Sequence, residues 1–239
     1  MNRTALLFAA AMVAGLSWAH AETLPLPESA IGLASPQGQA LLLGAEASND
    51  YFALSMHFTT QDNPAYCGPA TIAMVLNAMN IPRPASKLTL GLGMFDQKNI
   101  FTPAAEAVKS ADAIVNPPYG MTLDEFAGVL AAHDLNVELV HASDTNLDSF
   151  RRTAIEQLAD SDHFMIVNYL RKAIGQEAGG HISPLAAYDQ DTDRFLILDV
   201  SRYKYPPVWI EAAQLFDAMN TEDSDNGNKT RGYVSVSRR

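Results

Sequence analysis

Cysteine is nearly absent from this chain, because Cys67 is the only one among 239 residues. A single cysteine excludes an internal disulfide, so the fold has to be held together by its core. Basic residues are also scarce, with 16 Lys and Arg against 27 Asp and Glu and a formal net charge of −11. An acidic chain without a basic stripe is not expected to bind nucleic acid, and an anionic substrate would need locally placed arginines.

Metal-binding motifs and membrane spans are missing as well. The six histidines show no HExxH spacing, and a lone cysteine cannot form CxxC, so no metal site is expected. After the N-terminal region, no run of about 20 apolar residues occurs that would cross a membrane. The chain is therefore expected to function away from the bilayer.

The first 21 residues have the pattern of a secretory signal. Arg3 supplies a positive charge, residues 5–16 are apolar, and Ala19-His20-Ala21 is typical of a cleavage site. We therefore expect residues 1–21 to be removed from an exported, periplasmic protein. Residues 22–239 are then long enough to bury the core of one domain.

Cys67 lies where a chain would place a nucleophile. Pro69 suits the first turn of a helix, because its missing N–H would be unpaired there. Apolar residues then recur at the i, i+3, i+4 and i+7 positions of a helix face, at Ile72, Val75, Leu76 and Met79. A helix beginning at Cys67 would favour the thiolate through its unpaired amides and its dipole. The alternatives are a small buried apolar residue or an intermolecular disulfide partner.

The hydrophobic pattern changes from helical to strand-like along the chain. Residues 22–50 are expected to form an extended lead-in, and further helices are predicted near residues 103–110, 122–133 and from 145 onwards, the second opened by a capping box at Thr122 and Glu125. Strands are predicted at 164–170, 181–189, 194–200, 203–210 and 232–237, and a polar loop at 220–229. This order predicts an α+β fold whose helical N-terminal half packs on an antiparallel sheet.

The predicted hairpin brings a histidine beside a carboxylate. If its turn centres on Gln190, paired positions sum to 380, and His181 lies opposite Asp199. An aspartate beside a histidine fixes the tautomer of the imidazole and stabilises its charged form, as in acyl-transfer triads. Alternatively, His181 is a satisfied histidine at a strand end and Asp199 caps a turn.

The spacing of these residues is similar to that of papain-like thiol enzymes. His181 and Asp199 follow Cys67 by 114 and 132 residues (181 − 67 and 199 − 67), near the roughly 130–150 of those enzymes. Gln61 could direct its amide at a developing oxyanion together with the Cys67 backbone N–H. The Gly179-Gly180 pair is either a flexible loop or a site of close approach by a substrate backbone.

Longer blocks of sequence resemble the phytochelatin synthase family, specifically its short prokaryotic members. The resemblance runs from about residue 58 to residue 236 and rests on the blocks at 61–68, 168–172, 179–187 and 195–209. It implies a papain-like cysteine protease fold and transfer of γ-glutamylcysteine from glutathione. By position it makes Cys67 the nucleophile, His181 the general acid and base, and Asp199 the orienting carboxylate, and the oxyanion donor is then Gln61.

The same resemblance assigns substrate-binding residues. Arg171 and Arg231 match arginines that hold substrate carboxylates in the family, and Gly180 is expected beside the substrate. Bidentate guanidinium groups suit glutathione, which carries two carboxylates. The alternative for both arginines is an exposed, solubilising role.

Plant-type members carry a cysteine-rich C-terminal region linked to metal-responsive synthesis, and this chain ends soon after the catalytic domain. The resemblance therefore supports the first acylation step best, with hydrolysis to γ-Glu-Cys ahead of transfer to a second glutathione. No cofactor is expected to be required. The resemblance leaves open whether a heavy-metal ion such as cadmium acts as an activator or as part of a metal–glutathione substrate. It also leaves open whether the protein forms a homodimer. The alternative function is an exported papain-like peptidase of broader specificity.

Overall fold

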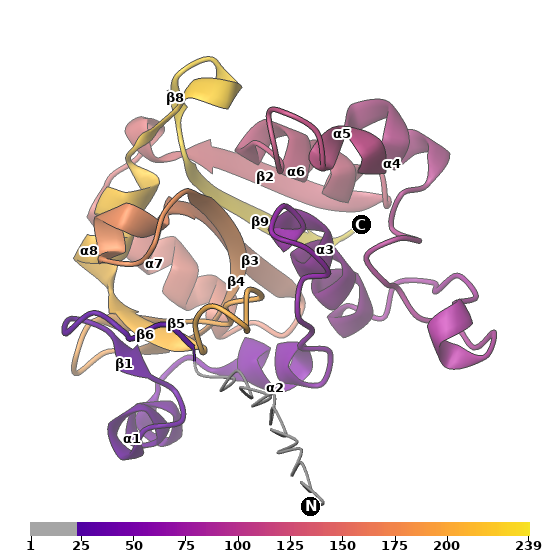
Figure 1. Cartoon of the computed structure of the whole chain (residues 1–239). Helices are drawn as coiled ribbons and strands as arrows, with labels where there is room; N and C mark the ends of the chain where they lie inside the picture. The colour runs from indigo at the N-terminus through magenta and orange to yellow at the C-terminus, as the bar shows by residue number, and fades with distance from the viewer. Residues whose placement is uncertain (1–22) are drawn as a thin grey trace, which may run out of the picture.

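The computed structural model describes residues 23–239, and its main element is one antiparallel sheet (Figure 1). Seven strands lie in the order β1-β6-β5-β4-β3-β9-β2. Their bounds are β1 Ile31–Gly32, β2 Leu135–His141, β3 His163–Leu170, β4 Gly180–Asp189, β5 Arg194–Ile197, β6 Val208–Glu211 and β9 Gly232–Arg238. The predicted signal segment, residues 1–21, lies outside the described residues.

Eight α-helices are assigned in this part of the chain, and they cover both faces of the sheet (Figure 1). They are α1 Pro36–Gly44, α2 Asn49–Ser55, α3 Cys67–Ala78, α4 Pro103–Val108, α5 Ala111–Ile114, α6 Leu123–Ala131, α7 Leu147–Leu158 and α8 Ala212–Met219. Short 3₁₀ turns are η1 Lys87–Thr89, η2 Ala142–Asp144, η3 Arg171–Ile174 and η4 Ser224–Asn226. None of the helices from residue 23 onwards is long and apolar enough to cross a membrane.

Two hydrophobic clusters lie on opposite faces of the sheet. One joins α3 and α6 to strand residues such as Ile166 and Ile182. The other joins α7 and α8 to residues such as Met165 and Val167. Because successive strand residues face opposite sides, β3 contributes to both clusters. This confirms the prediction of a strand buried on both faces, and the α+β fold class is confirmed with it.

The predicted helices are found, and the capping box is formed as expected. Thr122 Oγ1 accepts a hydrogen bond from the Glu125 N–H, while a Glu125 carboxylate oxygen accepts one from the Thr122 N–H. The extended lead-in predicted for residues 22–50 is wrong, because α1 and α2 form there. Ser35 begins α1 by accepting a hydrogen bond from the Gly38 N–H, and a proline in its first turn is compatible with the helix.

The later strands differ from the prediction in detail. The segment 203–210 is a strand only over β6, and the predicted polar loop at 220–229 contains a small hairpin of β7, Glu222–Asp223, and β8, Lys229–Thr230. This hairpin leads directly into β9, and Asp223 and Asp225 on it line the main cavity.

The register predicted for the β4–β5 hairpin is wrong. Near the turn, Asp189 pairs with Arg194, a sum of 383 rather than 380. A bulge between Leu185 and Ala187 then changes the sum to 382 at the pair Leu185 and Ile197. One extra residue in a strand reverses which side chains share a face. Continued beyond β5, this register places Asp199 diagonal to His181 rather than opposite it (183 + 199 = 382).

Asp50, in the first turn of α2, provides a test of stability against pH. It is 1% exposed, and within the described residues neither carboxylate oxygen has a hydrogen-bond partner. Burial, with the charge of Asp160, raises the pKa of Asp50 from 3.8 to about 9. The folded state therefore keeps a proton that the unfolded chain releases, so stability falls as pH rises between these two pKa values.

Asp50→Asn is expected to raise the free energy of unfolding at about pH 8 by roughly a few kcal/mol, and by less at about pH 5. Asparagine stays neutral in both states, so the variant lacks the pH-dependent cost. Urea unfolding of the variant and of exposed Asp191→Asn as a control measures the difference. An equal effect of Asp50→Asn at both pH values would contradict the assignment.

Candidate active site

The N-terminus of α3 places Cys67 at the wall of a cavity. Cys67 is the first residue of the helix, as predicted, and is 8% exposed. The next residue, Gly68, has no side chain and lets Met121 pack closely against the start of α3. A Cβ atom at this position would lie 2.6 Å from the Met121 Sδ atom. The glycine after the thiol thus allows the helix to begin in close contact with Met121.

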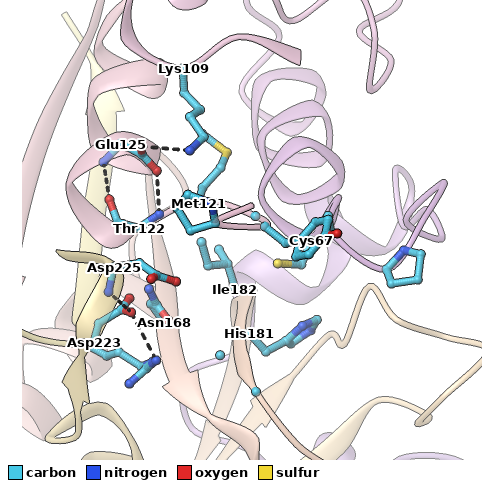
Figure 2. Close-up of a pocket in the computed structure, with 18 of the residues that line it drawn as sticks. Cys67, Lys109, Met121, Thr122, Glu125, Asn168, His181, Ile182, Asp223 and Asp225 are labelled. Atoms are coloured by element: carbon cyan, nitrogen blue, oxygen red, sulfur yellow. Dashed lines mark hydrogen bonds and ion pairs between the residues drawn. The ribbon is translucent and has the colours of Figure 1, made fainter. Parts of the chain in front are cut away.

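The cavity has a volume of about 740 Å³, within the range of small-molecule sites. Figure 2 shows that Cys67, from α3, and His181, from β4, line one part of the cavity. Thr122 and Glu125 of the α6 capping box line a second part, and Asp223 and Asp225 of the β7–β8 hairpin line a third. Sequence-predicted residues in its lining are Cys67, Gly180, His181 and Arg231. Gln61, Arg171 and Asp199 are not among the lining residues.

The imidazole of His181 and the Ile182 N–H both act on the ionisation of the Cys67 thiol, and both lower its pKa. Burial, the largest influence, opposes ionisation of the thiol. These two groups and the positive charge of Arg171 nevertheless bring the pKa of Cys67 below its ordinary value of 9.0. The site therefore favours a thiolate, which is the nucleophilic form.

Asp199 interacts with the imidazole of His181 through its Nε2 atom. His181 Nε2 lies 2.9 Å from Asp199 Oδ1 and 2.9 Å from Ser183 Oγ. Because these oxygens occupy Nε2, Nδ1 is the ring nitrogen left to interact with the thiol. Burial lowers the pKa of His181, but the charge and hydrogen bond of Asp199 outweigh burial and raise this pKa above 6.5. The contact predicted between His181 and Asp199 exists, although the pairing that was expected to produce it does not.

Arg171 has a different partner from the predicted one. It is the first residue of η3, directly after β3, and its guanidinium lies 2.7 Å from Asp199 Oδ2 and 2.8 Å from Asp199 Oδ1. It also donates to Gln176 and lies over the ring of Tyr205. Arg171 is thus buried behind the carboxylate and does not face the cavity. The substrate-carboxylate role predicted for it is not supported by these contacts.

Arg171 also acts on the electrostatics of the site. Burial opposes the charge on Asp199, but the positive charges and hydrogen bonds of His181 and Arg171 hold the pKa of Asp199 far below 3.8. The carboxylate therefore stays ionised at any working pH, and the polar chain runs Cys67–His181–Asp199–Arg171. The sequence identifies Arg171 as a site residue but not its pairing with Asp199, which depends on η3 and on the position of Asp199 after β5.

Tyr169 was also missed. It pairs with His181 across β3 and β4, and its ring meets the imidazole edge-on at 5.7 Å between centroids. Both rings are buried, so Tyr169 limits the orientations available to the imidazole. Its position in a run of buried strand residues gave no signal beyond packing.

Gln61 is buried close to the site and is anchored to neighbouring groups. Its Nε2 atom donates to the Asn63 carbonyl at 2.7 Å and to Tyr203 Oη at 3.2 Å, and its backbone N–H donates to the Val200 carbonyl. The backbone bond links the segment before α3 to the segment after Asp199. The oxyanion role of Gln61 stays a prediction.

Arg231 lies in the cavity wall, as predicted for a substrate-binding residue. Its Nη1 atom donates to the Glu222 carbonyl at 2.6 Å, and its Nη2 atom lies 3.4 Å from Asp223 Oδ1. The Nε atom is buried and has no hydrogen-bond partner among the described residues. Gly180 lies against it, since a Cβ atom there would be 3.2 Å from Arg231 Nε. A glycine at this position therefore lets the backbone at the start of β4 lie close to the guanidinium.

The opposite part of the cavity carries a second ion pair that sequence reasoning missed. Lys109 Nζ lies 3.1 Å from a Glu125 carboxylate oxygen, and the side chain of Lys109 is 10% exposed. The capping box at Thr122 was the available signal for the position of Glu125. No group of three or more metal-ligating side chains occurs within residues 23–239.

A thiol and an imidazole that line one cavity on an α+β scaffold, with the imidazole paired to a carboxylate, form the arrangement that cysteine-dependent acyl transfer requires. The phytochelatin synthase family model matches residues 21–233, and the chain belongs to this family of enzymes.

Relatives named glutathione gamma-glutamylcysteinyltransferase are similar over most of the chain. The enzyme numbered 3 from Lotus japonicus is 34% identical over 222 residues, covering 92% of this chain and 44% of the relative. The enzyme numbered 1 from Arabidopsis thaliana is 31% identical, with 92% and 44% covered. The enzyme from Schizosaccharomyces pombe is 29% identical, with 87% and 49% covered. The chain thus spans about half the length of these relatives.

Proposed function

We propose that this protein transfers the γ-glutamylcysteinyl group of glutathione through a thioester on Cys67 and releases glycine. The observation that carries the proposal is the pairing of His181 with Asp199 at a cavity that Cys67 also lines, with the pKa of Cys67 lowered by His181. The family and its named transferases supply the substrate class. This reading implies a papain-like arrangement, with a nucleophile helix packed against a sheet that carries the histidine.

Acylation follows from the polarity of the site. The Cys67 thiolate attacks the carbonyl carbon of the Cys–Gly peptide bond, and the tetrahedral oxyanion meets the Cys67 N–H, an N-terminal amide of α3 without a partner inside the helix. The Gln61 amide is the second proposed donor, for which it exchanges its bond to Tyr203. Protonated His181 gives its proton to the departing glycine nitrogen, so the C–N bond breaks and the thioester remains.

Deacylation uses the same imidazole in its neutral form. His181 takes a proton from water, or from the amine of a second glutathione, while the oxygen or nitrogen attacks the thioester. The C–S bond breaks and its electron pair returns to Cys67 as thiolate. Hydrolysis to γ-Glu-Cys is the first choice, and peptide elongation is the second. A heavy-metal ion enters this scheme only as an activator or as part of a metal–glutathione substrate.

Arg231 is the proposed anchor for the α-carboxylate of the γ-glutamyl group. A guanidinium with one buried, unpartnered N–H offers a charge-assisted hydrogen bond to a carboxylate. Asp223, beside it, matches the adjacent ammonium group of the same amino acid. Together the two residues would fix the donor with its Cys–Gly bond toward Cys67.

Activity is expected to rise and then fall with pH. The acid limb follows ionisation of Cys67, whose pKa lies below 9.0, and the alkaline limb follows loss of the His181 proton, whose pKa lies above 6.5. Because Asp199 raises the pKa of His181, Asp199→Asn is expected to move the alkaline limb to lower pH. Initial rates of glycine release between about pH 5 and pH 10 measure both limbs. If the alkaline limb of Asp199→Asn lies at the same pH as that of the wild-type protein, Asp199 does not raise the pKa of His181.

Incubating the purified protein with glutathione and assaying free glycine tests the function. Stoichiometric appearance of glycine and of γ-Glu-Cys or longer γ-Glu-Cys peptides supports it. The alternative is a broader exported peptidase, and faster cleavage of ordinary α-linked peptides than of glutathione would favour it. Tight metal binding without glycine release would point away from both enzymes.

A further inference from the structure

We infer that Lys109 forms a second carboxylate subsite, on the leaving-group side of the scissile bond. Figure 2 shows Lys109 and Glu125 at one part of the cavity, Asp223 and Asp225 at another, and Cys67 and His181 on the facing wall. Of the described residues that line the cavity, Lys109 and Arg231 carry permanent positive charge. The inference rests on the proposed function, in which Arg231 anchors the donor.

The side chain of Lys109 is held in place and retains donor capacity. Glu125 Oε1 accepts its ion pair at 3.1 Å, while Glu125 Oε2 accepts the Thr122 N–H at 2.9 Å. The capping box thus fixes the carboxylate, and the carboxylate fixes the ammonium. An ammonium has three N–H donors, and this ion pair uses one of them. The charge of Lys109 is therefore preorganised, with little entropy left to lose on binding an anion.

The surroundings of Lys109 suit the end of an amino acid or short peptide. Val115, Pro118 and Met121 also line the cavity, so the charged group sits beside an apolar wall. A side chain that is 10% exposed is shielded from bulk water, and charge pairs are screened less in such a position. A carboxylate at the end of a small apolar group matches this combination.

In the proposed reaction, the carboxylate that binds Lys109 has two possible sources, the leaving group and the acceptor, and both would place it in the same position. An acceptor amine attacks the thioester from the position that the glycine nitrogen left, because the second half-reaction retraces the first. The new C–N bond forms, the C–S bond breaks, and the amine proton passes to His181. The carboxylate of the departing glycine, and the α-carboxylate that an acceptor glutathione carries on the same carbon as its attacking amine, therefore take the same position on the side away from Arg231. Lys109 is the cation placed to receive either one.

The test compares glutathione with its glycinamide analogue, in which the glycyl carboxylate is a neutral amide. Wild-type protein is expected to use glutathione at least about tenfold better in kcat/KM for release of the C-terminal amine, glycine or glycinamide, as for a lost charge-assisted hydrogen bond. Lys109→Met is expected to abolish this preference, Lys109→Arg to keep most of it, and exposed Lys98→Met to leave it unchanged. A lost preference in this release identifies the donor carboxylate, and a lower ratio of transfer to hydrolysis in Lys109→Met with glutathione as acceptor identifies the acceptor carboxylate.

Wild-type protein that releases glycine and glycinamide equally well would overturn the inference without any variant, even if Lys109→Met failed to fold. Lys109→Met protein that keeps the full preference would also overturn it and leave the ion pair with Glu125 as a structural link between α4 and α6. Either result, obtained with normal glycine release, leaves the proposed function standing. Absence of glycine release from the wild-type protein would instead overturn the function and this inference together.

Discussion

Replacing Cys67 by serine is expected to lower glycine release from glutathione by at least about 10³-fold, because a hydroxyl is not ionised by the contacts that favour the thiolate. Serine fits the same space at the start of α3, so thermal unfolding and glutathione binding should change little. Free glycine, measured under initial-rate conditions, gives the ratio. Activity that survives in Cys67→Ser would discard the thioester mechanism.

Exposed Ser143→Ala is a suitable control for handling and fold, since Ser143 lies in η2, outside the cavity lining. Its rate of glycine release should match that of the wild-type protein. A parallel loss in both variants would point to unstable preparations rather than to the loss of a nucleophile.

Asp199→Asn is expected to reduce both activity and stability. The rate of glycine release should fall by up to about 10⁴-fold, because the imidazole loses the carboxylate that orients it and stabilises its charge. The free energy of unfolding should fall by about 3–5 kcal/mol, because Arg171, 3% exposed in its side chain, is left without its buried counter-ion. Kinetics and urea unfolding measure the two losses separately.

Adding Arg171→Met to Asp199→Asn separates the two roles. The double variant removes the unpaired buried charge, so it should recover part of the stability that Asp199→Asn loses. It should recover no activity, because the imidazole still lacks its carboxylate. Recovery of both quantities would mean that Asp199 acts on the reaction only by supporting the fold.

The sequence was sufficient where local rules decide the structure. Pro69 and the apolar residues at i, i+3, i+4 and i+7 predicted a helix beginning at Cys67, and the Thr122–Glu125 capping box predicted the start of α6. The unbroken apolar run of β3 predicted burial on both faces. In each case the signal and the structure that it specifies lie within one or two turns or a single strand.

Long-range geometry was not predictable in the same way. The turn lies further along the chain than Gln190, which makes the paired residue numbers sum to 383 rather than 380, and the bulge between Leu185 and Ala187, which leaves no composition signal, changes this sum to 382. The strand β2 is not predicted, although Leu135, Val137 and Leu139 alternate with polar residues, because the first half of the chain has a mainly helical pattern. The partner of Arg171 depends on η3 and on the position of Asp199 after β5, which no local pattern encodes.

The buried charges show the same limit. Asp50 and the Lys109–Glu125 pair look like ordinary surface residues in the sequence, because each lies next to a helix end or a polar segment. Their burial results from packing between elements that are far apart along the chain, such as α2 against β4. Only the fold distinguishes them from solvent-exposed charges.

The most direct test is the mass of the intact protein after brief exposure to glutathione and rapid acid quench. The account predicts an added mass equal to glutathione less glycine, confined to Cys67, stable to reductant and removed by hydroxylamine, as a thioester is. An added mass equal to whole glutathione, removed by reductant, would show a mixed disulfide instead. That result, or an acyl group on any residue other than Cys67, would contradict the central claim.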